Sequence, residues 1–174
     1  FGVMLPAMLF GSISGNHLNP AVTLAQATAG VFPWAQVTPY IISQVLGAIC
    51  GQLLIITIYW PYIKKSTDSN IVFACFATSD CVNSKWNGFI SELVGTGVLM
   101  FVAIGLYKGM FFKQAVDIAN IGVGFLITAL VMALGGPTGP ALNPARDFGP
   151  RLVYSILPIP NKKDAHWSYG WVPV

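Results

Sequence analysis

The first charged residue of the chain is Lys64, so residues 1–63 contain no Asp, Glu, Lys or Arg. A second uncharged run covers residues 118–145, and Glu92 is the single charge within residues 86–107. A helix needs about 20 mostly apolar residues to cross the hydrocarbon core of a bilayer, and each run supplies that length. Only 9% of the residues are charged, whereas about a quarter are charged in an ordinary soluble domain. The sequence therefore predicts an all-α integral membrane protein.

Apolar length divides the chain into complete spans and shorter segments. Three runs are long enough to cross a bilayer: residues 36–60, 86–107 and 118–134. Two apolar segments are too short: residues 20–29 and 144–157. Polar residues 11–19 interrupt a first helix at residues 1–10, and Gly135-Gly136-Pro137 ends the third complete span. We expect connections at 61–85 and 108–117, a loop at 158–166, and the opening of another span at 167–174.

Both short segments begin with the same three residues. Asn19-Pro20-Ala21 lies in "SGNHLNPA" and Asn143-Pro144-Ala145 lies in "TGPALNPA", so the chain contains an internal repeat. Non-helical backbone at membrane depth is tolerated only where it is buried in protein or lines a watery cavity. Two such breaks in matching positions indicate a substrate path. Since three spans separate the copies, they must enter from opposite faces of the membrane and meet near its midplane.

The chemistry of the repeat suits a pore for neutral solutes. Asn is a favoured helix N-cap, and Pro is favoured at the first helical position. The Asn oxygen can cap the helix while its NH2 group stays free to donate to a water or alcohol oxygen. Two facing helix N-termini repel protons and cations. One copy alone would be a simple helix cap, but two copies in matched positions favour the pore.

Three further polar residues in apolar surroundings are candidates for a role in the pore. Arg146 follows the second motif, and an ionisable residue within a membrane indicates a functional site; the alternative is a buried pair with Asp147. Glu92 is predicted to accept hydrogen bonds from backbone N–H groups of a re-entrant loop, or else to lie in water at a span boundary. His17 is either a packed histidine or a pore donor.

No feature indicates an enzyme, a metal, a cofactor or a nucleic-acid partner. The net charge of +3 is small and scattered, and the three cysteines lack metal-ligand spacing. We predict that Cys50 is a small core residue. Cys75 and Cys81 share one polar connection and either pair in an oxidising compartment or remain free thiols.

At the doubled Asn-Pro-Ala and Arg146, the chain closely resembles the aquaporin and aquaglyceroporin channels of the major intrinsic protein family, over essentially all of its 174 residues. Gln44 and Glu92 also fall where the family has such residues. The resemblance implies six spans plus two half-helices, passive flow, and a homotetramer. It implies that this chain begins within the second span and stops early in the sixth. We expect one channel domain, with a partial first half at 1–60, a connecting loop at 61–85 and a second half at 86–174.

Four residues resemble the glycerol-conducting branch of the family: Tyr59, Asp147, Arg151 and Pro173, the last followed by aliphatic Val174. By the same resemblance, the selectivity filter comprises Arg146, with Val131 and Pro140 at positions where glycerol facilitators commonly have Gly and Phe. A further filter position precedes Phe1. The resemblance also implies a ladder of backbone carbonyls from Gly15, Asn16 and His17 on one side and from Gly139, Pro140 and Ala141 on the other.

We therefore expect a multi-pass cell-membrane protein that passes glycerol, similar small neutral solutes and water, but not ions. A water-selective pore is the alternative within the class. An ion-coupled carrier should have several acids in its spans, whereas this chain has Glu92, and a junction protein with a vestigial pore would not need both Asn residues and Arg146. The short basic connection at 108–117 favours a cytoplasmic location for that loop.

Overall fold

The computed structural model describes residues 1–108 and 116–174, with the backbone alone at 116 and 117. Within these residues the regular structure is entirely helical, as predicted. The helices are α1 (Met4–Ser14), α2 (Pro20–Thr28), α3 (Trp34–Lys65), α4 (Ser69–Ala74), α5 (Lys85–Lys108), α6 (Val116–Leu134), α7 (Pro144–Ile156) and α8 (Trp167–Gly170). The predicted connection at 108–117 lies mostly outside the described residues.

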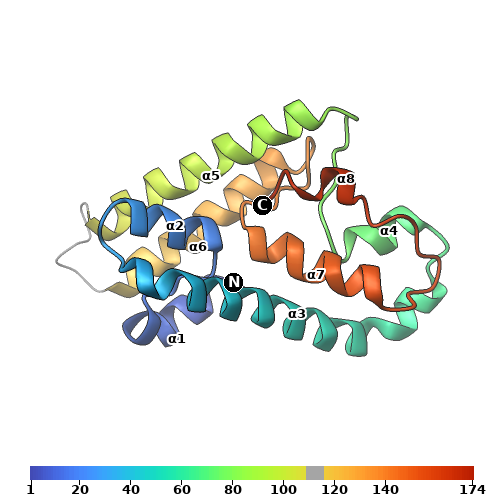
Figure 1. The fold of residues 1–174 in the computed structure, drawn as a ribbon, viewed down its shortest axis with the longest axis horizontal. Coiled ribbons are helices and arrows are strands. Elements are labelled where there is room, and N and C mark those ends of the chain that lie inside the picture. The colour runs from blue at the N-terminus through green and yellow to red at the C-terminus, as the bar shows by residue number, and fades with distance from the viewer. Residues whose placement is uncertain (109–115) are drawn as a thin grey trace.

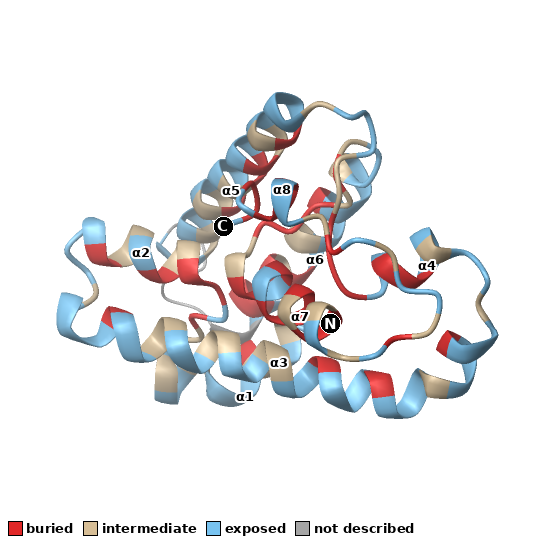
Figure 2. Ribbon diagram, turned by 45° about the vertical axis from the view of Figure 1, so that its right-hand side comes forward, coloured by how far each residue is buried: buried red, intermediate tan, exposed pale blue. Residues whose placement is uncertain are grey.

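Helices α3 and α5 are long and apolar enough to cross a membrane. The 32 residues of α3 extend for about 48 Å, well beyond the roughly 30 Å of a hydrocarbon core. The outward faces of both helices are largely exposed (Figure 2). The large apolar side chains exposed there include Leu46, Leu54, Ile58, Ile90, Leu93 and Phe101. Such faces would be unfavourable in water and are suited to lipid.

In Figure 1 the short helix α7 lies between α3 and α5, and the short helix α2 lies beside the first part of α3. Helix α7 packs along α3, and α2 contacts both of them. Helix α7 approaches α3 closely at Gly149, where a Cβ atom would lie 3.0 Å from the Cβ of Ala48 and 3.3 Å from the carbonyl oxygen of Val45. Small residues permit this close packing of membrane helices.

The first helix ends later than its sequence suggested. The polar residues 11–14 were expected to interrupt it, but α1 continues through Ser14. The hydroxyl of Ser14 donates to the carbonyl of Phe10 at 3.2 Å, so this polar group finds its partner inside the same helix. The chain turns instead at Gly15 and Asn16, whose φ angles are 66° and 54°. Two consecutive left-handed residues cannot continue a right-handed helix.

Three other boundaries differ from the predictions. Helix α3 continues through Pro61 to Lys65. Pro61 has no N–H to donate to the carbonyl four residues earlier, so one hydrogen bond is missing from the last turns of this helix. The predicted connection contains α4, whose first turn is capped by Asp68 at 2.8 Å from the N–H of Asn70. Within the predicted opening of a further span at 167–174, the helical part is α8, a single turn that ends at Gly170.

A buried apolar cluster joins the connection to the far ends of α3 and α7. Its members are Ile56, Ile63, Val72, Phe73, Phe76, Ala77, Val153, Tyr154, Ile159 and Ala165. At its centre the rings of Phe73 and Tyr154 meet edge to face with centroids 5.3 Å apart. An aromatic pair of this geometry contributes about 0.5–1.5 kcal/mol beyond its buried area. The cluster fixes the connection against α7, which carries the second Asn-Pro-Ala motif.

Candidate pore and selectivity site

Each Asn-Pro-Ala motif starts one of the two half-helices, α2 and α7. The side-chain oxygen of Asn19 accepts from the N–H of Ala21 at 2.9 Å. That of Asn143 accepts from the N–H of Ala145 at 3.0 Å and of Arg146 at 3.3 Å. Pro20 and Pro144 occupy the first helical positions, where a missing N–H costs nothing. The two asparagines are thus N-caps of α2 and α7.

The two caps also bind each other's loops. The amide nitrogen of Asn19 donates to the carbonyl of Leu142 at 2.6 Å, and that of Asn143 donates to the carbonyl of Leu18 at 2.8 Å. The expectation that both NH2 groups stay free was therefore wrong, because each uses one proton to tie the two half-helices together. An amide NH2 has two protons, so one on each asparagine is left for a solute.

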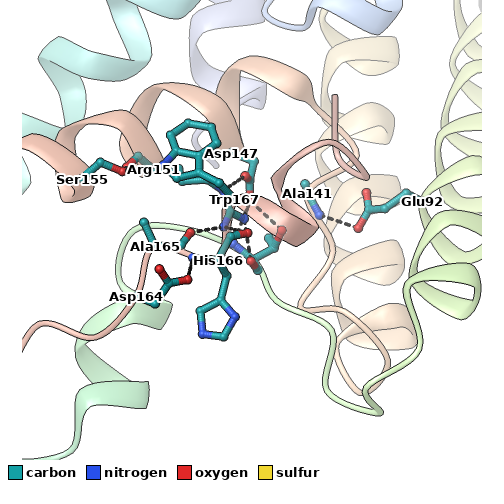
Figure 3. Close-up of polar contacts among 10 residues, drawn as sticks. Glu92, Ala141, Asp147, Arg151, Ser155, Asp164, Ala165, His166 and Trp167 are labelled. Atoms are coloured by element: carbon teal, nitrogen blue, oxygen red, sulfur yellow. Dashed lines mark hydrogen bonds and ion pairs between the residues drawn. The ribbon is translucent and has the colours of Figure 1, made fainter.

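Glu92 supports the loop that precedes α7. Its carboxylate accepts from the hydroxyl of Thr138 at 3.1 Å and from the backbone N–H groups of Ala141 at 3.0 Å and Leu142 at 2.7 Å. Figure 3 shows Glu92 reaching Ala141 from α5. Glu92 is only 5% exposed, so it lies in the protein interior and not at a hydrated boundary. It holds this loop in a conformation in which Gly139 and Leu142 have φ angles of 58° and 52°.

Gln44 supports the loop that precedes α2. Its amide nitrogen donates to the carbonyl of His17 and, at 2.9 Å, to the hydroxyl of Thr23. The two halves therefore hold their loops by opposite chemistry. In the first half an amide from α3 donates to the loop, and in the second a carboxylate from α5 accepts from it. Both side chains come from long helices, which hold the loops in place.

The residues predicted to form a carbonyl ladder lie in these two loops. The carbonyl of Asn16 accepts from the N–H of Leu18 at 2.9 Å, and that of His17 accepts from Gln44. A carbonyl oxygen has two lone pairs, so both retain capacity for another donor. In the described part of the chain, no protein donor reaches the carbonyls of Gly139, Pro140 or Ala141.

The side chain of His17 is packed and not open to solvent. It is 6% exposed, and its ring lies against Phe32 and Tyr40, with centroid distances of 4.6 Å and 5.5 Å. The imidazole is therefore packed against aromatic rings, while the carbonyl of His17 accepts from Gln44.

The three predicted filter residues lie on α6, in the loop before α7, and on α7 itself. Arg146 lies in the first turn of α7 with an exposed side chain, and Pro140 is buried in the loop before it. Val131 is 46% exposed on α6. Arg146 does not pair with Asp147, since the one ion pair among the described residues joins Asp147 to Arg151.

Asp147 and Arg151 form a fully buried pair one helical turn apart on α7 (Figure 3). The Nε of Arg151 lies 2.7 Å from one carboxylate oxygen and its Nη2 lies 3.0 Å from the other. The guanidinium also donates to the carbonyls of Thr78 at 2.7 Å and Ala165 at 2.6 Å, and to that of His166 at 3.2 Å. These two residues therefore bind protein, and no sequence pattern indicated Thr78 as their partner.

The remaining predicted residues lie apart from this network. Tyr59 is exposed on α3, where its ring centroid is 6.0 Å from that of Tyr62. Pro173 is buried near the end of the chain. Neither takes part in the hydrogen bonds around Asn19 and Asn143.

The cysteines and acids form no metal site in the described residues, where no group of three or more His, Cys, Asp or Glu side chains occurs. Cys75 and Cys81 are free thiols. Cys50, predicted to be a core residue, is exposed instead, because its side of α3 faces outward.

Comparisons with known proteins agree with this architecture. The sequence model of the family described as "Major intrinsic protein" matches residues 1–174. The chain is 66% identical over 173 residues to the "Glycerol uptake facilitator protein-like 5" of Lactiplantibacillus plantarum, covering 99% of this chain and 69% of that protein. It is 45% identical over 172 residues to the "Probable glycerol uptake facilitator protein" of Thermotoga maritima, covering 99% of this chain and 72% of that protein.

A solved structure shares the fold. The X-ray structure of the aquaglyceroporin from Plasmodium falciparum superimposes with a TM-score of 0.82 at 28% identity, covering 98% of this chain and 70% of that chain.

Proposed function

Because this chain belongs to the major intrinsic protein family, we propose that it forms a passive channel that conducts glycerol and other small neutral solutes, together with water. It is a multi-pass integral membrane protein of a channel family. The names of its relatives, glycerol uptake facilitators at 66% and 45% identity, support glycerol as the solute.

The observation that carries the proposal is the reciprocal bonding of Asn19 and Asn143. Each caps one half-helix and donates one proton to the loop of the other. The second proton of each amide can donate to one oxygen of a passing water or glycerol. The positive ends of α2 and α7 lie at the same place, so a cation there gains nothing that offsets its lost hydration.

We assign the choice of solute to the residues around Arg146. Its guanidinium has five donors for solute hydroxyls and repels cations. Val131 and Pro140 complete the filter in this proposal, with apolar surface for the carbon atoms of glycerol. The carbonyls of Gly15, Asn16, His17, Gly139, Pro140 and Ala141 accept hydrogen bonds from those hydroxyls along the path.

We also propose that the channel assembles as a homotetramer in the cell membrane. Large apolar side chains such as Leu5, Leu9 and Ile13 on α1 are exposed, so this helix has a face free to pack against another subunit or lipid. Native mass spectrometry of the detergent-purified protein tests the proposal: a tetramer supports it, and a monomer at all concentrations contradicts it.

Light scattering of proteoliposomes tests the transport function. Vesicles shocked with sucrose shrink and stay shrunken, and vesicles shocked with glycerol shrink and re-swell if glycerol enters. We expect fast re-swelling in glycerol that scales with the amount of protein. Fast water efflux without recovery in glycerol would identify a water-selective pore instead.

A further inference from the structure

One residue of the connection between the two halves is bound to α7 through both its side chain and its backbone. The N–H and the hydroxyl of Thr78 donate to the same carboxylate oxygen of Asp147, at 2.8 Å and 2.6 Å. The carbonyl of Thr78 accepts from Arg151 at 2.7 Å. Thr78 is 4% exposed, so water does not compete for these groups. The position of this residue is therefore fixed relative to α7 by three hydrogen bonds.

A second tie joins the same stretch of chain to the loop before α7. The N–H of Cys81 donates to the carbonyl of Pro137 at 3.0 Å. Pro137 lies just before the loop that contains Pro140, and Asp147 lies directly after Arg146. Residues 78–81 are thus attached at both ends of the segment 137–147, which carries Pro140 and Arg146. They must therefore run beside these two proposed filter residues.

The ion pair makes this attachment rigid. Both Asp147 and Arg151 have no exposed side-chain surface. A buried charge that loses a partner is strongly unfavourable, so neither side chain can swing away from Thr78. The guanidinium also donates to the carbonyls of Ala165 and His166, in the loop before α8. The pair on α7 therefore binds two separate connections at once.

We propose that Thr78 is a positioning residue for solute selection: bound by Asp147 and Arg151, it holds residues 78–81 beside Arg146 and so limits the width of the path there. This inference rests on the proposed channel function. Neither Thr78 nor the pair needs to touch the solute. Loss of the hydroxyl bond leaves the two backbone bonds of Thr78, so the connection is loosened, the wall beside Arg146 can move outward, and larger solutes then pass.

The test compares a five-carbon polyol, xylitol, with glycerol in light-scattering measurements on proteoliposomes. Thr78→Val removes the hydroxyl and keeps the shape, whereas Thr78→Ser keeps the hydroxyl. Thr57→Val is the matched control, because the hydroxyl of Thr57 binds the carbonyl of Leu53 within α3 at 2.9 Å, on an exposed face. The ratio of the two permeabilities does not depend on how much protein is active, so a general loss of stability leaves it unchanged.

We expect Thr78→Val to raise the xylitol-to-glycerol permeability ratio about threefold to tenfold, the effect of losing one hydrogen bond on a transport barrier. Thr78→Ser and Thr57→Val should keep the wild-type ratio. An unchanged ratio in Thr78→Val, or an equal change in Thr57→Val, would overturn the inference. If Thr78→Val does not assemble, the same comparison with Thr78→Ala decides by the same criterion. Failure of the wild type to conduct glycerol would instead contradict the proposed function.

Discussion

Asn19 and Asn143 each donate a hydrogen bond to the residue that precedes the other: Asn19 to the carbonyl of Leu142 at 2.6 Å, and Asn143 to the carbonyl of Leu18 at 2.8 Å. Each also caps the helix that it precedes. The two half-helices are therefore joined by bonds of the same kind in both directions. Each asparagine of the motif therefore fixes the start of its own half-helix and also holds that half-helix against the loop of the other one.

Replacement of either asparagine should weaken the fold as well as transport. Asn19→Ala removes a cap, worth about 1 kcal/mol, and a buried hydrogen bond of about 1 kcal/mol net. We expect a lower thermal midpoint in detergent and slower glycerol entry. Asn19→Asp keeps the capping oxygen but turns a second oxygen toward the carbonyl of Leu142 in a buried place, so it should lose stability as well. A wild-type midpoint and glycerol flux in Asn19→Ala would contradict this role.

Glu92→Gln should destabilise the loop before α7. The carboxylate accepts from the N–H groups of Ala141 and Leu142 and from the hydroxyl of Thr138. In the glutamine variant the side-chain NH2 group must face one of the two backbone N–H groups. At least one buried hydrogen bond is therefore lost, at a cost of about 2–3 kcal/mol. Thermal unfolding in detergent measures the loss. Asp68→Asn, at an exposed cap, is the control and should change little; equal midpoints for both variants would refute the prediction.

The buried pair on α7 should show strong coupling. Arg151→Met leaves the carboxylate of Asp147 buried without its charged partner, which costs about 3–5 kcal/mol. Asp147→Leu strands the guanidinium in the same way. The free energy of unfolding of the double variant should fall by less than the sum of the two single decreases, because no unpaired charge remains. Unfolding midpoints of the four proteins give this coupling, and strictly additive losses would rule it out.

Arg146→Val should change selectivity and leave the fold intact. The side chain of Arg146 is exposed and forms no ion pair within the described residues. Its removal takes a positive charge away from the proposed path, so we expect cation leakage to rise about tenfold, which corresponds to a barrier lower by ~1.4 kcal/mol. A dye-based leak assay on proteoliposomes measures this. Lys65→Val, at the exposed end of α3, is the control; if both variants leak like the wild type, Arg146 is not part of the filter.

Much of the helical architecture follows from apolar length and from two short motifs. Charge-free runs predicted the long helices, and Asn-Pro at two places predicted the starts of α2 and α7. Those signals are local, because capping and helix propensity depend on neighbouring residues. The end of α1 was misplaced, since Ser14 can either break a helix or bind the preceding turn, and the sequence does not decide between these.

The contacts between distant segments were harder to predict. Nothing in the residues around Thr78 indicates that its N–H and hydroxyl bind Asp147, because that contact depends on how the connection folds over α7. The crossing bonds of Asn19 and Asn143 were missed for a similar reason. An amide that can donate to a solute can equally donate to a carbonyl, and only the approach of the two loops decides which.

Glycerol flux and proton flux, measured in the same vesicles, decide whether the two motifs form a pore for neutral solutes alone. Proteoliposomes that contain a pH-sensitive dye are given an inward glycerol gradient and, separately, a potassium diffusion potential with valinomycin. We expect rapid glycerol entry with a proton leak equal to that of protein-free vesicles. A proton leak that grows with the amount of protein, or no glycerol entry above the lipid background, would contradict a pore in which Asn19, Asn143 and two helix N-termini pass neutral solutes and exclude charge.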